Sequence, residues 1–232
     1  MLGTIVNSLA IILGGIVGLL LKKGIPEKMK KTVLHGVGLA VLLIGLKMAL
    51  QTENELIVII CLLVGGLLGE ALRIDRGLER FGELLQSKLG KKEGDFVQGF
   101  VTASLIFCIG AMAIIGSIES GINQNHQVLY TKATLDMITC AILTSTFGIG
   151  ALFSFLPVFI YQGLLTLLAA GVADYLTPQV VSYMSATGGL LIVGISMNIM
   201  EIKKINVANL LPAIFVAVFV VTFLAKIRPG FL

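Results

Sequence analysis

Long, uninterrupted apolar stretches constrain this chain more than any other feature. The first of them, residues 2–21, contains no charged side chain. A helix needs about 20 mainly apolar residues to cross the hydrocarbon core of a bilayer. Only helices and closed barrels can cross it, because lipid offers the backbone no hydrogen-bond partner. The stretches are continuous rather than alternating, which favours helices over a barrel. The sequence therefore predicts an all-α, polytopic transmembrane bundle.

Composition agrees with this prediction. Hydrophobic residues form 56% of the 232 positions and charged residues only 13%. Soluble domains are about a quarter charged, because water must cover their surface. This chain has too little polar surface for a water-facing exterior, so its predicted outer solvent is lipid.

Seven or eight transmembrane spans are predicted. Residues 135–172 are about twice as long as one crossing requires, so we divide them between residues 150 and 157. If one half is re-entrant, seven full crossings remain. The predicted spans are residues 2–21, 32–50, 56–72, 96–118, the two halves of 135–172, 180–200 and 205–225.

One long polar segment, about residues 74–92, lies between the third and fourth predicted spans. Ile74, Leu78, Phe81 and Leu85 recur at helical spacing, with arginines and acids around the rest of the helix. This pattern is typical of an amphipathic helix in the membrane interface. A packing element that binds no ligand is the simpler interpretation of it.

The distribution of basic residues predicts the orientation, because lysines and arginines near span ends stay cytoplasmic. Thirteen of them lie in the loops after the first, third and seventh spans. The other side has Lys132, Lys226 and Arg228, and Lys47 lies inside a span. We therefore expect a bacterial cytoplasmic (inner) membrane protein with both termini extracytoplasmic and the loop of residues 73–95 cytoplasmic.

Two segments predict an inverted repeat. Residues 41–50 and 190–199 share a glycine and a methionine at the same spacing, Gly45 with Gly194 and Met48 with Met197. The loop after the first copy is acidic and the loop after the second is basic, as opposite orientations require. We predict a single integral membrane domain, residues 1–232, with three-helix repeats at about 1–73 and 153–228 and central spans at about 96–152. Such repeats characterise many secondary transporters.

The fourth span is the first candidate for a substrate path. Its small residues, which include Gly110, Gly116 and Ser117, lie where a helix could open and expose backbone groups. The alternative is that they only let helices approach closely. A path of this kind would add Asn7, Asn198 and Gln162 as polar lining, although interhelical hydrogen bonding is the default role of such side chains.

Ionisable residues within membrane helices are costly and often functional. Lys47 lies one turn from an acidic outer loop, so snorkelling is the simpler explanation for it. Asp136 follows Lys132 by four residues, which predicts a structural i,i+4 pair at the outer end of the fifth span. The full set of path candidates is Gly110, Gly116, Ser117, Asn7, Asn198, Gln162, Lys47 and Asp136.

Other classes of site find little support in the sequence. Neither histidine has a metal partner at ligand spacing, and the three cysteines lie singly in apolar runs. Known catalytic motifs are missing, so we expect no enzyme, and nothing predicts a nucleic-acid partner. Gly14 with Gly18, and Gly65 with Gly69, form small-residue faces that pack helices together or join a homo-oligomer.

Several motifs together resemble one family. They are LGTIVN at 2–7, LIGLKM at 43–48, FCIGAMAIIGSI at 107–118, LYTK at 129–132, YQGLLT at 161–166 and NLLPA at 209–213. Along nearly its whole length the chain resembles the YdfK/YqgA (DUF554) family of multi-pass bacterial membrane proteins. The resemblance implies an inner-membrane protein without a cofactor, and it supplies no function.

The sequence thus favours a small-solute or ion secondary transporter or permease, whose partners are the lipid bilayer and an unknown solute. A non-transporting scaffold or regulator that acts through its amphipathic loop is the alternative. A protein that handles lipids through a lateral groove is a third hypothesis. A permease should have a polar cavity near the midplane, reached from one side between the repeats. A scaffold should be packed solid there, with any functional surface on the loop of residues 73–92.

Overall fold

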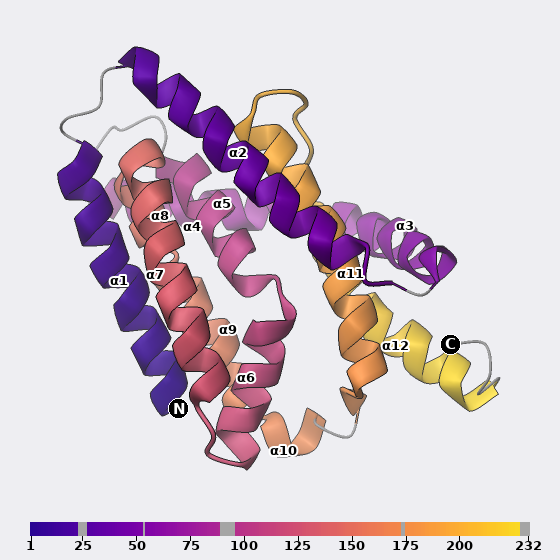
Figure 1. Ribbon diagram of the computed structural model, residues 1–232. Helices are drawn as coiled ribbons and strands as arrows, with labels where there is room; N and C mark the ends of the chain where they lie inside the picture. The colour runs from indigo at the N-terminus through magenta and orange to yellow at the C-terminus, as the bar shows by residue number, and fades with distance from the viewer. Residues whose placement is uncertain (23–26, 53, 89–95, 173–174, 228–232) are drawn as a thin grey trace. The chain divides into compact units, whose positions relative to one another are not determined.

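A computed structural model describes residues 1–22, 27–52, 54–88, 96–172 and 175–227. Every regular element in these ranges is a helix (Figure 1). In chain order they are α1 (Leu2–Lys22), α2 (Glu27–Ala49), α3 (Glu55–Leu72), α4 (Ile74–Lys88), α5 (Phe96–Cys108), α6 (Ala111–Ile122), α7 (Gln127–Phe147), α8 (Ile149–Leu152), α9 (Phe155–Leu167), α10 (Ala169–Val172), α11 (Pro178–Ile199), the 3₁₀ helix η2 (Val207–Leu210) and α12 (Pro212–Ile227).

The predicted all-helical, multi-span architecture is confirmed. Six segments of the described chain are long and apolar enough to cross a membrane, and the bent pair α5–α6 brings the number to seven. The six are Leu2–Leu21, Lys31–Ala49, Glu55–Leu72, Ile149–Leu167, Pro178–Ile199 and Val207–Leu224. An eighth crossing would require α7, which has 21 residues but carries Lys132 and Asp136.

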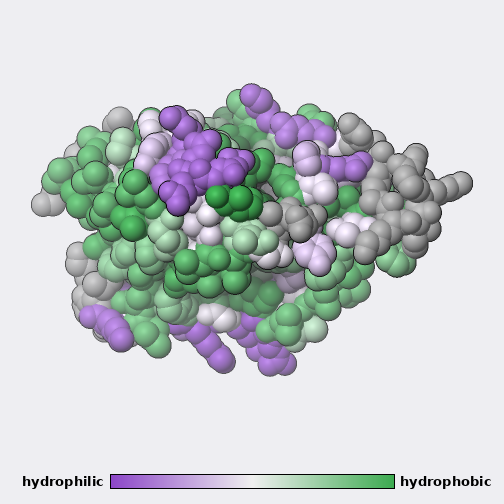
Figure 2. Space-filling model, turned by 90° about the horizontal axis from the view of Figure 1, so that it is seen from below, coloured by the Kyte–Doolittle hydropathy of each residue, from purple (hydrophilic) through white to green (hydrophobic). Residues whose placement is uncertain are grey.

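Large apolar side chains cover much of the described surface. Leu67, Phe219 and Leu20 are 70–75% exposed. Figure 2 shows one face on which hydrophobic residues dominate and hydrophilic ones gather in separate groups. Exposed patches this extensive are rare on soluble monomers. They fit helices whose outer faces contact lipid.

The chain forms two compact units that each draw on distant parts of the sequence. Unit 1 comprises Met1–Val37, Gly77–Cys108 and Met112–Ala170. Unit 2 comprises Gly38–Arg76, Ile109–Ala111 and Gly171–Leu232. The first helix of each predicted repeat, α1 and α9, belongs to unit 1. Unit 2 holds α3, α11, α12 and the second half of α2.

In unit 1, α1 packs most extensively against α7. A Cβ atom on Gly14 would collide with the carbonyl oxygen of Met137, and one on Gly18 with that of Ala141. The contacts advance along both helices together, so α1 and α7 run parallel and side by side (Figure 1). Glycine allows this approach because it has no side chain to separate the backbones.

The chain reverses direction between α7 and α9. Gly148 ends α7 with a φ of 85°, in the region that favours glycine, and its N–H bonds to the carbonyl of Thr144. After the short helix α8, α9 runs antiparallel to α1, because Thr4 meets Thr166 while Asn7 meets Gln162. The predicted division of residues 135–172 between residues 150 and 157 therefore coincides with a real reversal.

In unit 2, α3 lies against α12 and α11 lies against α12. A Cβ atom on Gly65 would overlap Ala213, and one on Gly69 would overlap the backbone of Asn209. The predicted small-residue faces of α1 and α3 are thus packing faces. They are filled from within the chain, by α7 and α12, so the predicted homo-oligomer gains no support from them.

The fourth predicted span is broken, as its glycines suggested. Helices α5 and α6 are bent by 60° relative to each other. Gly110 lies at the break with a φ of 146°, a conformation that side-chain-bearing residues rarely adopt. The candidate path residue Gly110 is thus the point at which the helix opens.

The amphipathic helix is also confirmed, as α4, although its predicted end at residues 89–92 lies outside the described residues. Arg73, in the left-handed conformation, ends α3 and lets α4 begin at once. Gly82 of α4 packs against Phe100 and Val97 of α5. This contact anchors the helix to unit 1.

Candidate functional site

Four buried polar side chains meet among the helices of unit 1. Asn7 comes from α1, Lys132 and Asp136 from α7, and Gln162 from α9, and none is more than 6% exposed. We call these four residues the Asp136 cluster. Glycines bring α1 close to α7, and α9 meets α1 at Thr166 and Gln162, so the cluster lies in the interior of the unit.

Asp136 is the centre of the cluster. Its Oδ2 atom lies 2.5 Å from Nζ of Lys132 and accepts a hydrogen bond of 3.1 Å from Nδ2 of Asn7. The same Asn7 nitrogen donates to Oε1 of Gln162 at 3.3 Å. A continuous chain of polar contacts therefore connects a cation, an anion and two amides across three helices.

The Lys132–Asp136 pair is the predicted i,i+4 pair, but its environment differs from the prediction. We expected the pair at the outer end of a span, with Lys132 in the loop before it. Both side chains are instead over 90% buried. The glycine packing of α1 and the antiparallel α9 exclude solvent from that face of α7, which a count along the sequence does not reveal.

A fifth side chain approaches the lysine. Nζ of Lys132 lies 5.9 Å from the ring centroid of Phe107 on α5. An ammonium at this distance is attracted to the negative face of the ring. Phe107 therefore offers Lys132 a second, weaker stabilising contact that does not depend on Asp136.

Two atoms of the cluster are buried and unused. Among the residues that the structure describes, Oδ1 of Asn7 and Nε2 of Gln162 have no hydrogen-bond partner. The carboxylate of Asp136 needs a donor, so Nδ2 of Asn7 faces it. The same nitrogen then needs an acceptor from Gln162, so Oε1 of Gln162 faces Asn7. Each unused buried group costs about 1–3 kcal/mol. One acceptor and one amide nitrogen are thus available to a bound molecule.

Two further candidates, Gly116 and Ser117, lie on α6, which packs against the cluster-bearing helices. A Cβ atom on Gly116 would lie 2.9 Å from the side chain of Leu129 on α7. Ser117 is fully buried, and its hydroxyl has no partner in the described part of the chain. Gly116 is therefore a packing residue, whereas Ser117 is an unused polar group in the same unit.

The other three candidates belong to unit 2 and do not join the cluster. Gly110 lies at the helix break, and Lys47 has an exposed side chain in the last turn of α2. Asn198 binds both backbone groups of Ile205, donating at 2.8 Å and accepting at 2.7 Å. Its amide is fully occupied in closing the loop between α11 and η2, which is a structural role.

Asn209 has a comparable role at another corner of unit 2. Its Nδ2 donates to Oε2 of Glu70 at 2.7 Å, and its Oδ1 accepts from the backbone N–H of Asp75 at 2.8 Å. Glu70 and Asn209 lie in two different predicted spans, residues 56–72 and 205–225, and nothing in the sequence connects them. The structure joins them, because α3 ends where the 3₁₀ helix η2 begins to cover it.

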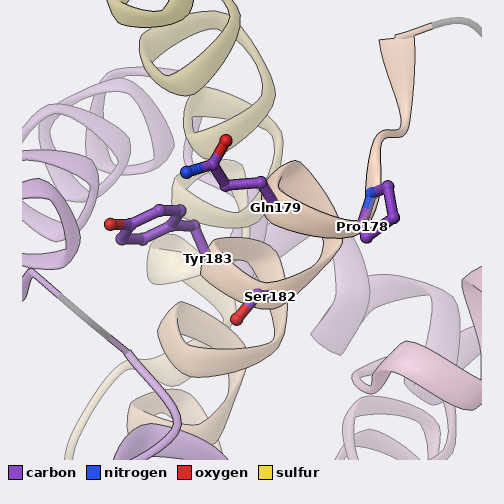
Figure 3. Close-up of a pocket in the computed structure, with 4 residues that line it drawn as sticks. All are labelled: Pro178, Gln179, Ser182 and Tyr183. Atoms are coloured by element: carbon purple, nitrogen blue, oxygen red, sulfur yellow. The ribbon is translucent and has the colours of Figure 1, made fainter. Parts of the chain in front are cut away.

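Unit 2 also has a pocket at the start of α11, with a volume of about 320 Å³. Pro178, Gln179, Ser182 and Tyr183 line it, and Figure 3 shows Gln179 and Tyr183 extending to the same side of the helix, one turn apart. Thr177 caps this helix end by accepting from the N–H of Val180. The pocket contains no charged side chain, and none of the predicted path residues lines it.

Sequence analysis missed Lys132 as a site residue. It assigned Lys132 to an outer loop because the apolar stretch appeared to begin at residue 135. Helix α7 in fact begins at Gln127, one and a half turns earlier than Lys132. The available signal was the i,i+4 spacing to Asp136, which identified the pair but not its burial.

The described residues contain no group of three or more histidine, cysteine, aspartate or glutamate side chains that could hold a metal ion. The Asp136 cluster itself combines a charged pair with two amides. Such a set can bind a polar solute or exchange a counter-ion.

Comparisons with known proteins place the chain in a family. A family model described as "Protein of unknown function (DUF554)" matches residues 2–222. The chain is 32% identical over 220 residues to "Uncharacterized membrane protein YdfK" of Bacillus subtilis (strain 168), with 93% of each chain covered. It is 29% identical over 221 residues to "Uncharacterized protein YqgA" of Escherichia coli (strain K12), covering 93% of this chain and 94% of that one. No solved structure matches the chain. It is a multi-pass membrane protein that belongs to the DUF554 family.

Proposed function

We propose that the protein is a secondary transporter or permease for a small solute or ion, with the Asp136 cluster as its binding site. The observation that carries the proposal is the buried contact of Lys132 and Asp136 with two amides that have unused polar atoms. Ionisable residues inside membrane proteins are expensive and usually mark ion or substrate pathways. A purely structural bundle would be more stable with apolar residues in their place.

The direction of the packed helices supports the predicted inverted repeat. In the proposed arrangement α1, α2 and α3 correspond to α9, α11 and α12. Each helix contacts its counterpart, and each pair is antiparallel. For α2 and α11, Gly38 lies opposite Met200, whereas Gly45 lies opposite Val193 and Gly189. For α3 and α12, Gly65 lies opposite Ala213 and Gly69 opposite Asn209.

Two repeats of opposite sense would pair in this way around a pseudo-two-fold axis in the membrane plane, as in many secondary transporters. The broken helix at Gly110 is a second feature of that class, since irregular backbone within a membrane is tolerated beside a cavity or within packed protein. In the proposed topology α7 also crosses the membrane, which brings the number of crossings to eight. Both termini are extracytoplasmic, and the loop that contains α4 faces the cytoplasm of a bacterial cell.

An osmotic swelling assay tests the proposal directly. Proteoliposomes with the purified protein would be exposed to neutral, anionic and cationic solutes in turn. We expect at least one class to enter faster than into protein-free liposomes. The double variant Lys132→Met/Asp136→Leu, which removes both charges together, should lower that rate by at least about tenfold.

Gly77→Ala is the matched control, because no atom lies within 4 Å of a Cβ at that position. Transport by this variant should equal that of the wild type. If no solute class enters faster than in protein-free liposomes, the transporter proposal fails. A scaffold that acts through α4 then becomes the better explanation.

A further inference from the structure

We infer that the Asp136 cluster couples the movement of one proton to that of one small monocarboxylate. In this scheme Lys132 pairs alternately with the carboxylate of Asp136 and with the carboxylate of the solute. The inference rests on the proposed transport function and adds to it a substrate class and a coupling ion.

Lys132 brings a buried positive charge to the site. The Lys132 ammonium is 6% exposed and bonds directly to Asp136. A buried ammonium without an anion is costly, so Lys132 retains a counter-anion in every stable state. A monocarboxylate can replace Asp136 as that anion only if the charge of Asp136 disappears. Protonation of Asp136 is the reaction that removes it.

The groups around Asp136 indicate which ion can couple to the solute. The surroundings of Asp136 contain few other groups that titrate. Its own helix α7 contributes Lys132 and Cys140, α5 contributes Cys108, and α9 contributes Tyr161, which interacts with Cys108. From α1 the facing group is the neutral amide of Asn7. No second carboxylate interacts with Asp136 in the described part of unit 1.

A metal cation is a poor alternative to the proton here. Hard cations need several oxygen ligands. Oδ2 of Asp136 already accepts from an ammonium and an amide, and the ammonium repels a second cation at the same oxygen. A proton needs one lone pair and is therefore the ion that fits.

The two unused amide atoms, Oδ1 of Asn7 and Nε2 of Gln162, match the change from an ionised to a protonated Asp136. Nδ2 of Asn7 donates to the ionised carboxylate and to Gln162, whereas its unused Oδ1 is an acceptor to which the O–H of a protonated Asp136 could donate. The unused Nε2 of Gln162 is a donor, and a carboxylate oxygen of the solute is an acceptor. The Asn7 oxygen thus acquires a partner with the proton, and the Gln162 nitrogen acquires one with the anion.

The exchange balances in atoms and charge. A proton from water binds an oxygen of the Asp136 carboxylate and forms the neutral acid. The contact between Lys132 and Asp136 then separates, and the ammonium pairs with the incoming monocarboxylate. The site is neutral before and after the exchange. On release, the anion leaves, Asp136 loses its proton to the opposite side, and the original ion pair reforms.

Binding measurements on the purified wild-type protein test the scheme. The probes are formate, lactate and gluconate as sodium salts, with formamide and lactamide as neutral analogues and succinate as a dianion. If one proton enters with each anion, affinity for the monocarboxylate should rise about tenfold for each unit by which the pH falls below neutral. The neutral analogues should show no such dependence. Binding of the three monocarboxylates that does not change with pH would overturn the inference.

The variant Asp136→Asn gives the decisive contrast, because its side chain resembles the protonated state permanently. We expect it to bind the same monocarboxylate with an affinity that no longer depends on pH. In proteoliposomes that contain a pH-sensitive dye, the wild type should acidify the lumen when the anion is added, and the variant should not.

The possibility that Asp136→Asn folds poorly is itself informative. Its Lys132 lacks a counter-anion, so an added monocarboxylate should raise the melting temperature of the variant more than that of the wild type. A variant that monocarboxylates do not stabilise contradicts the scheme. If a neutral solute passes the swelling assay while no monocarboxylate moves protons, this inference fails and the transport proposal stands. If no solute passes, both fail.

Discussion

The two units use the same residue type, asparagine, for opposite purposes. In unit 2 both ends of the Asn198 amide bind the backbone of Ile205, and Asn209 joins Glu70 to the N–H of Asp75. In unit 1 the nitrogen of Asn7 binds two side chains from other helices, and its oxygen is unused. An amide with both ends bound holds the chain in place. A buried amide that has one unpaired atom and lies next to a charge can bind a further molecule.

The packing of the two units is otherwise alike. Glycines let α1 approach α7 in unit 1 and let α3 approach α12 in unit 2. Close helix packing therefore does not distinguish a functional unit from a structural one. The charged pair of Lys132 and Asp136 distinguishes unit 1 from unit 2.

The largest effect should come from removing one charge of unit 1. We expect Asp136→Leu or Lys132→Met to lower the free energy of unfolding by about 3–5 kcal/mol, because each leaves an unpaired buried charge. The double variant should recover most of that stability. Unfolding of purified protein in mixed micelles, titrated with a denaturing detergent, measures all three. If the single variants are no less stable than the double variant, water solvates the pair and the contrast between the two units disappears.

The second effect should be equal in both units. Alanine at Gly14 would collide with the Met137 carbonyl, and alanine at Gly69 with the Asn209 backbone. Each should cost up to about 3 kcal/mol, the usual upper range for overpacking a core. The same detergent titration applies, with Gly36→Ala as control because nothing lies within 4 Å there. A large loss in one unit only would show that the units are not packed alike.

The third effect should separate the asparagines. Asn198→Ala leaves two backbone groups of Ile205 without partners, so we expect a loss of about 2 kcal/mol in stability with the swelling rate unchanged. Asn7→Ala should lower the swelling rate as well as the stability, since it removes the donor to both Asp136 and Gln162. Paired stability and swelling measurements check both. Equal effects of the two variants on transport would remove the distinction drawn between them.

The smallest effect concerns the helix break. Gly110→Ala places a side chain at a φ of 146°, which costs about 1 kcal/mol or slightly more. The stability loss should be small because a Cβ there would meet only Cε of Met48, at 4.0 Å. Gly116→Ala, on the same broken span but within a helix, is the comparison. Infrared measurement of helix content would detect whether the break closes.

Local features of the sequence predicted much of this structure. Long apolar runs identified the spans, four apolar positions at helical spacing identified α4, and a glycine cluster identified the break at Gly110. Each of these depends on residues close together in the chain. The association of Asn7, Asp136 and Gln162 was anticipated only as a set of candidates, since contacts over 129 and 155 residues have no local signal. The partner of Asn198 was not anticipated, because Ile205 is in a loop whose path the sequence does not specify.

The parallel contact of α1 with α7 has a consequence for how the protein is made. At a synthesis rate of about 5–20 residues per second, the ribosome adds Asp136 roughly 6–26 s after Asn7. During that interval the polar side chain and the glycine face of α1 are in the membrane without the helix that will cover them. The nascent first helix must therefore be sheltered, by the insertion machinery or by lipid headgroups, until the fifth predicted crossing emerges. Chains that terminate early would present an uncovered α1 to membrane quality control.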